Sequence, residues 1–272
     1  MIRFWKGDVR VITTFASMKY GKQIFGVMLS VIAMGAWAQP QFSHPHGLYR
    51  QTTLTVGISA TDSEAEIRYT IDGSVPTAQS NLYTAPLTIN ATTLLRAAEV
   101  KADTLCSAVT TASYIFVESV LSQPNDPVGY PAEWGQYTDI QGTAIADYEM
   151  DPEMTGDETL RPKIVEGLYD LPILSIVTDK DNLFSHENDT ARGGIYIFTG
   201  PPVGDATGHG WTRPASVELI GGPQAHDMTI DCGLRLHGGH GRLAEKNPKH
   251  SFRLVFKDEY GPTTLNYPLF GM

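Results

Sequence analysis

A glycine-rich, basic stretch at residues 231–256 contains the side chains best suited to chemistry. Apolar residues occupy alternate positions at 234–236 and again at 252–256, which is the period of β-strands. Gly238 and Gly239 lie between these runs and let the backbone turn sharply or approach a ligand closely. Arg242 and Lys249 add positive charge at the same end. The stretch predicts a β-hairpin whose tip could cradle phosphate groups.

Two other interpretations of this tip remain open. A glycine-rich tip without a full phosphate-binding motif is also typical of a solvated turn between strands. His237 and His240 suggest a pair of metal ligands. A third ligand is not evident near them, and their positions close to a turn favour opposite faces. We therefore assign no residue to a metal.

Charge and cysteine content narrow the class of protein. The 272 residues carry a formal net charge of −10, which argues against a nucleic-acid partner. Cys106 and Cys232 are the two cysteines, too few for a disulfide scaffold and without the spacing of a metal site. A single bridge between them is the less favoured alternative.

Residues 1–38 have the pattern of a signal peptide. Lys19 and Lys22 form a charged segment, residues 24–35 are apolar, and Ala36-Trp37-Ala38 fits the small-x-small cleavage rule. We expect translation to start at Met18 and cleavage to follow Ala38, with an ordinary buried helix as the alternative. Because the sequence holds no later long apolar run, we expect no membrane span after cleavage. The mature chain is then secreted, periplasmic or on the cell surface.

Residues 41–117 predict a small immunoglobulin-like β-sandwich. Short strand-like runs are separated by turns, and Asp72-Gly73 is a strong turn signal. The runs are at 54–58, 66–71, 87–89, 93–97 and 112–117. Tyr49, Tyr69 and Tyr83 could bind carbohydrate, but aromatic residues dominate the cores of small domains, so we favour a core role. Asp72 is expected to set its turn rather than to bind a metal.

Several motifs in this segment resemble the C-terminal domain of chitobiases and β-hexosaminidases. They are Phe42-x-x-Pro45-x-Gly47-Leu-Tyr49, the run from Ile67 to Thr77, Tyr83-x-x-Pro86 and Thr92-Thr-x-Leu-Arg-Ala97. The resemblance implies a fibronectin-like accessory module without catalytic residues.

Residues 118–170 are expected to connect two domains. Residues 122–131 contain three prolines, which is typical of a linker or an extended surface arm, although Trp134 and Tyr148 suggest that the region packs. The acidic cluster at 147–158 could attract Ca²⁺, but it lacks the EF-hand spacing and is better explained as a solvated loop. A short helix is expected at 164–171.

Residues 171–272 predict the start of a second, α+β domain. We expect a buried strand at 171–177, a short helix capped by Asp179 or Asp181, and further strands at 194–198 and 214–220. Residues 199–210 are expected to form a loop, and the hairpin at 231–256 follows. The predicted fold is therefore mainly β, with a sandwich followed by this domain.

Motifs across residues 120–272 resemble the secreted kinases of the spore-coat protein H (CotH) family. They occur at 120–134, 147–152, 171–176, 194–196, 211–218, 233–239, 248–254, 260–261 and 267–270. The resemblance implies an atypical kinase that transfers phosphate from ATP, with Mg²⁺ or Mn²⁺, to a protein substrate. It assigns the nucleotide phosphates to Lys249 and then Arg242, beside Gly238 and Gly239. The family more often has serine where this chain has Gly241.

The resemblance also leaves catalytic residues unassigned. A kinase needs one acid to position the hydroxyl group and another to hold the metal. Asp258 and Glu259 are expected in a turn and do not form such a set. We expect the sequence to be the amino-terminal part of such a kinase and to be inactive alone, so its status as an enzyme stays open. The alternative is a non-catalytic surface protein that binds a cell-surface glycan or mediates adhesion.

Overall fold

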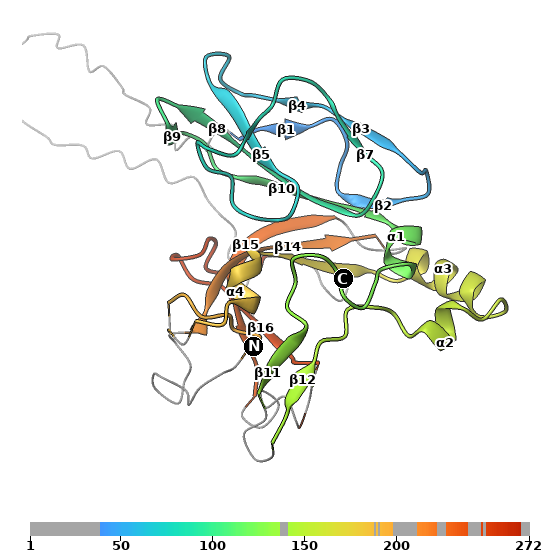
Figure 1. The fold of residues 1–272 in the computed structure, drawn as a ribbon. Helices are drawn as coiled ribbons and strands as arrows, with labels where there is room; N and C mark the ends of the chain where they lie inside the picture. Colours follow the sequence, from blue (N-terminus) through green and yellow to red (C-terminus); the bar gives the residue numbers. More distant parts are fainter. Residues whose placement is uncertain are drawn as a thin grey trace, which may run out of the picture. The chain divides into compact units, whose positions relative to one another are not determined.

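Alternating apolar residues build a six-stranded sheet in the first half of the chain (Figure 1). The computed structural model describes residues 39–136, 141–187, 189, 191–197, 211–221, 227–238, 246 and 249–267. The sheet consists of β2 (Gly47–Tyr49), β5 (Glu66–Thr70), β6 (Asn81–Leu82), β8 (Thr93–Lys101), β9 (Thr104–Leu105) and β10 (Thr110–Phe116). Its order is β2-β10-β8-β5-β6, with β9 paired to β8. The β2–β10 pair is parallel and the others are antiparallel.

Two short strand pairs complete the predicted sandwich. They are β1 (Gln41–Phe42) with β4 (Ile58–Ser59), and β3 (Leu54–Val56) with β7 (Leu87–Ile89). Leu54 and Val56 are buried while Thr55 between them is exposed, as the alternation predicts. The core cluster comprises Leu54, Val56, Ile58, Ile67, Ile89, Leu95, Ala97, Ala112, Tyr114 and Phe116.

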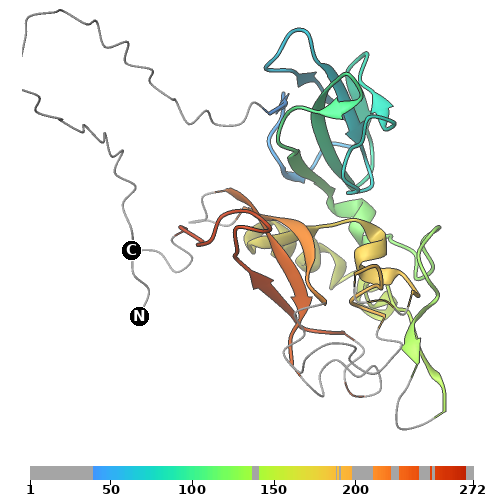
Figure 2. The ribbon, with the colours of Figure 1, turned by 90° about the vertical axis from the view of Figure 1, so that its left-hand side faces the viewer.

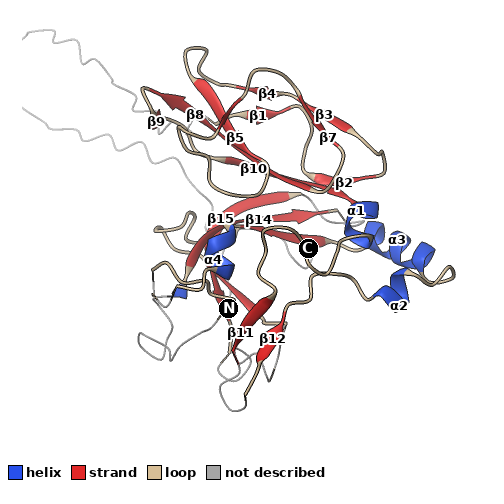
Figure 3. Cartoon of the chain, viewed as in Figure 1, coloured by secondary structure: helices blue, strands red, loops and turns tan. Residues whose placement is uncertain are grey.

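The connecting region is ordered by caps and aromatic packing. Its elements are α1 (Val117–Leu121), β11 (Glu133–Gln136), β12 (Thr143–Ile145), α2 (Pro152–Thr155) and α3 (Arg161–Asp170) (Figure 3). The helix expected at 164–171 is formed as α3, which begins three residues earlier and ends one residue earlier. Asp151 caps α2 by accepting the Glu153 N–H, and Asp157 accepts the N–H groups of Thr159 and Leu160. Asp151 therefore caps α2, and Asp157 orders the turn that precedes α3.

The second sheet is an antiparallel meander. It comprises β13 (Ile173–Val177), β14 (Arg213–Ile220), β15 (Met228–Leu236) and β16 (Phe252–Val255), in that order (Figure 2). The predicted strand at 214–220 and the predicted hairpin are confirmed. The strand expected at 171–177 is confirmed as β13, but the expectation that this strand is buried holds only in part. Because β13 is an edge strand, Leu174 is 49% exposed and Val177 is its fully buried residue.

The strand expected at 194–198 is not formed by its described residues, 194–197. Ile195 and Tyr196 are buried, but their N–H groups bind carbonyls of α4 (Lys180–Phe184), at Asn182 and Leu183. An apolar run whose N–H groups bind the free carbonyl groups at the end of a helix has the same apolar pattern in the sequence as a buried strand. Asp179, one of the two residues expected to cap α4, directly precedes the helix but makes no side-chain cap bond. Its carboxylate accepts the N–H of Val75 at 2.6 Å.

Candidate functional site

The predicted hairpin is formed by β15 and β16. Leu234 lies opposite Leu254, and Arg235 lies opposite Arg253. Leu234 is fully buried and packs in a cluster with Ile195, Trp211 and Ala215, against which Leu254 also packs. One face of the hairpin is thus anchored in a core, which fixes its register and leaves the other face to polar side chains.

Gly238 is the described glycine of the predicted phosphate tip. It is exposed and has φ +94°, a left-handed conformation that glycine adopts without steric cost. Gly239, His240, Gly241 and Arg242 lie outside the described residues, as do residues 199–210 and the predicted signal peptide.

Lys249 lies just before β16 and has a partner that the sequence did not suggest. Its Nζ is 3.3 Å from Oδ2 of Asp147, and the two side chains are 70% and 50% exposed. We assigned Asp147 to a solvated acidic loop. No spacing rule links the two positions, although both fall within motifs of the same resemblance. The fold therefore places a carboxylate beside the predicted phosphate lysine.

An aromatic cluster supports the backbone next to Lys249. The ring of His250 is buried 4.7 Å from that of Tyr196, whose hydroxyl accepts the His250 N–H. Trp134 packs on Tyr196 at 5.2 Å and on Tyr148 at 5.3 Å. Burial raises the pKa of Tyr196. The packing expected from Trp134 and Tyr148 is confirmed, and the cluster reaches His250, the residue after Lys249.

His237 is engaged by its own hairpin. Its Nδ1 lies 2.7 Å from a guanidinium nitrogen of Arg253, which can only donate, so Nδ1 acts as the acceptor. Asp258 accepts the N–H of Glu259 within the turn before Tyr260. Among the described residues, no three His, Cys, Asp or Glu side chains gather as a set of metal ligands.

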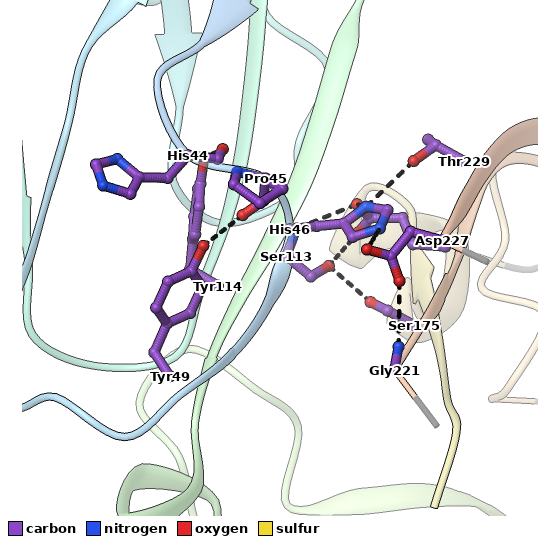
Figure 4. A network of polar contacts seen from close by, with 11 residues as sticks. His44, Pro45, His46, Tyr49, Ser113, Tyr114, Ser175, Gly221, Asp227 and Thr229 are labelled. Carbon is purple, nitrogen blue, oxygen red and sulfur yellow. Dashed lines mark hydrogen bonds and ion pairs between the residues drawn. The ribbon is translucent and has the colours of Figure 1, made fainter. Parts of the chain in front are cut away.

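A second polar group is buried where the sandwich sheet meets the second sheet (Figure 4). Glu218 of β14 is fully buried, and its Oε1 lies 2.7 Å from Nδ1 of His46. The other oxygen, Oε2, accepts the hydroxyl of Ser113, whose oxygen is also 2.7 Å from that of Ser175. Strands β10, β13 and β14 each contribute one of these side chains.

The surroundings of His46 in this group act on its pKa in opposite directions. Burial lowers the pKa of His46, but the hydrogen bond and the charge of Glu218, with the charge of Asp227, outweigh burial and raise it. Nδ1 of His46 is also 3.2 Å from the hydroxyl of Thr229. Sequence reasoning missed this network, because its members come from separate segments with no shared spacing.

The three tyrosines of the sandwich fill its core, as favoured from the sequence. Tyr49, Tyr69 and Tyr83 are partly buried against the core cluster, and the Tyr83 hydroxyl accepts the Ile58 N–H at 3.0 Å. Asp72 accepts both the N–H and the hydroxyl of Ser74, which confirms its role in the turn. Both cysteines are free, Cys106 at the surface and Cys232 buried.

The comparisons identify one segment of the chain. Residues 44–111 match the family model of the chitobiase/beta-hexosaminidase C-terminal domain. They lie inside the predicted sandwich, so that resemblance is confirmed. Neither the curated proteins nor the solved structures gave a match. Within the described ranges, no helix is both long and apolar enough to cross a bilayer.

Proposed function

We propose that the β15–β16 hairpin binds nucleotide phosphate in an exported protein of the CotH kinase family, which transfers phosphate from ATP to a protein. The observation that supports this proposal best is the ion pair of Lys249 with Asp147 beside the hairpin. Kinases place a lysine–acid pair next to the phosphates, because phosphoryl transfer depends mainly on positioning and on charge stabilisation.

The residues around Lys249 fit nucleotide phosphates. The Lys249 side chain is 70% exposed, and Gly238, two residues beyond β15, has a left-handed backbone conformation with φ +94°. Gly239 and Arg242 follow in the sequence and would add a close backbone approach and a second positive charge. Asp147 would hold the Lys249 side chain in place until phosphate replaces it as the counter-charge.

A divalent metal has a weaker fit to the described residues. Asp147 supplies one carboxylate beside Lys249, and three potential ligands do not gather anywhere in the described chain. When bound, Mg²⁺ or Mn²⁺ would neutralise the phosphate oxygens. We therefore assign phosphate binding to Lys249 and assign no residue to the metal.

Titration of the protein with Mg-ATP tests this proposal. We expect measurable binding that weakens about tenfold or more in Lys249→Ala, because a charge-assisted contact is lost. Lys163→Ala is the matched control, since Lys163 is an exposed lysine of α3 without a partner among the described residues. Equal affinities of wild-type protein and Lys249→Ala, or the absence of ATP binding by folded protein, would contradict the proposal.

The match at residues 44–111 supports a second candidate, a non-catalytic surface protein that binds glycans. A glycan array probes this candidate directly. Binding that disappears in Tyr69→Ala, with the sandwich still folded, would favour it. Because Tyr69 packs on the core and on Tyr83 at 6.4 Å, that variant needs a parallel unfolding measurement.

A further inference from the structure

We propose that the outer face of the β15–β16 ribbon is a separate binding site for a phosphate group, formed by Arg235, Arg253 and Lys257. The two arginines are directly opposite each other in the antiparallel register. Their neighbour Leu234 belongs to the core cluster and Leu254 packs against it, so the arginines project from the other face. Like charges directly opposite in a sheet repel each other, and an anion between them removes that cost.

The turn after β16 forms a wall of this site. A cavity is lined by Thr212, Arg235, Arg253, Lys257, Glu259 and Tyr260, together with Leu254 and Val255 of β16. The ring of Tyr260 lies directly on Gly233, where an added Cβ would be 2.7 Å from it. Glycine at this position therefore allows the Lys257–Tyr260 turn to fold against β15, beside the arginine pair.

The charge balance of the cavity is positive. Among the described residues that line it, Glu259 is the one carboxylate, and it interacts with the phenol of Tyr260, whose pKa is raised by burial and then by Glu259. Arg253 donates to Nδ1 of His237, which is an acceptor nitrogen rather than a carboxylate. Arg235 and Lys257 have no ion pair with any residue in the described ranges. In a chain of net charge −10, three cations facing one carboxylate form an unusual concentration.

The hydrogen-bond donors of Arg235, Arg253 and Lys257 indicate which class of anion the cavity would bind. A guanidinium group presents paired N–H donors that match two oxygens of a phosphate, and an ammonium group adds a point charge. Two guanidinium groups and one ammonium group suit a dianionic phosphate or phosphate monoester better than a single carboxylate. Lys249 does not line this cavity, so the inference does not depend on the proposed nucleotide function.

Calorimetric titration of the protein with inorganic phosphate, at low and constant ionic strength, tests the site. We expect saturable binding that weakens about tenfold in Arg235→Gln and in Arg253→Gln. Binding should persist in Lys249→Ala and in Lys163→Gln, which removes a distant exposed charge. Saturable binding that is unchanged in both arginine variants, or no saturable binding by wild-type protein, would overturn the proposal.

A thermal melt without phosphate separates loss of binding from loss of folding. We expect Arg235→Gln to melt no lower than wild-type protein, because the substitution relieves repulsion by Arg253. A large drop in its melting temperature would show a structural role and count against the site. Displacement of inorganic phosphate by ATP would show that the phosphate group bound at this site belongs to a nucleotide. Failure of ATP to displace it would indicate that the ligand is free phosphate or a small phosphate monoester.

Discussion

His46 and Glu218 are 172 positions apart in the chain, yet their side chains meet at 2.7 Å. The imidazole belongs to the segment before β2, and the carboxylate is fully buried on β14. A buried carboxylate must be paired or hydrogen-bonded, because burying an isolated charge is very costly. The pair therefore constrains how the sandwich sheet packs against the second sheet.

The His46–Glu218 pair predicts a loss of stability as the pH rises. The folded-state pKa of His46 is raised above its usual 6.5, so the charged imidazole is favoured in the folded protein. Its contribution is complete below that usual value and disappears as the pH rises through the folded-state value. Urea unfolding at about pH 5.5 and about pH 8.5 should show this difference in wild-type protein but not in His46→Gln.

His44→Gln serves as the control for that measurement. It removes a nearby histidine whose ring contacts Ser43 rather than Glu218. The control should keep the pH dependence of wild-type protein. The same pH dependence in His46→Gln would contradict the assignment.

Removal of the buried carboxylate should destabilise the protein strongly. Glu218→Ala leaves the hydroxyl of Ser113 and the ring of His46 without their acceptor in a dry environment. We expect a loss of about 3 kcal/mol in the free energy of unfolding, measured with urea. Glu158→Ala, at an exposed position, should change it by less than about 0.5 kcal/mol. A loss below about 1 kcal/mol for Glu218→Ala would argue against a paired, buried charge.

The Lys249–Asp147 pair should contribute little to stability. Both side chains are at least half exposed, so solvent and salt screen their attraction. A double-mutant cycle of Lys249→Ala and Asp147→Ala should give a coupling energy below about 1 kcal/mol that shrinks with added salt. A salt-independent coupling of several kcal/mol would instead assign the pair a structural role.

Gly233 should resist substitution because Tyr260 and Thr212 leave no space for a side chain. A Cβ there would lie 2.6 Å from Cγ2 of Thr212. We expect Gly233→Ala to cost about 1–3 kcal/mol in unfolding experiments. Gly167→Ala in α3 is the opposite case, since nothing lies within 4 Å, and it should stabilise the helix by about 0.5–1 kcal/mol. Equal effects of the two substitutions would rule out this packing argument.

Local patterns predicted most of the strands. Alternation at 54–58 and 66–71 marked strands of the sandwich because one face of each lies in the core. The same reasoning failed at 194–197, where apolar residues are buried by capping α4 rather than by pairing in a sheet. Any buried segment has an apolar sequence pattern. Only the partners of its backbone N–H groups show whether it is a strand of a sheet or a segment bonded to the end of a helix.

The sequence by itself determined the sandwich, the hairpin and the basic character of that hairpin, because each depends on residues that are close in the chain. Tertiary structure decided which distant side chains meet, namely His46 with Glu218, Lys249 with Asp147, and Tyr260 with Gly233. It also placed Arg235 opposite Arg253, since strand register follows from packing of the apolar face. Contacts between distant segments have no spacing rule, so the candidate sites became defined only when the strands were paired.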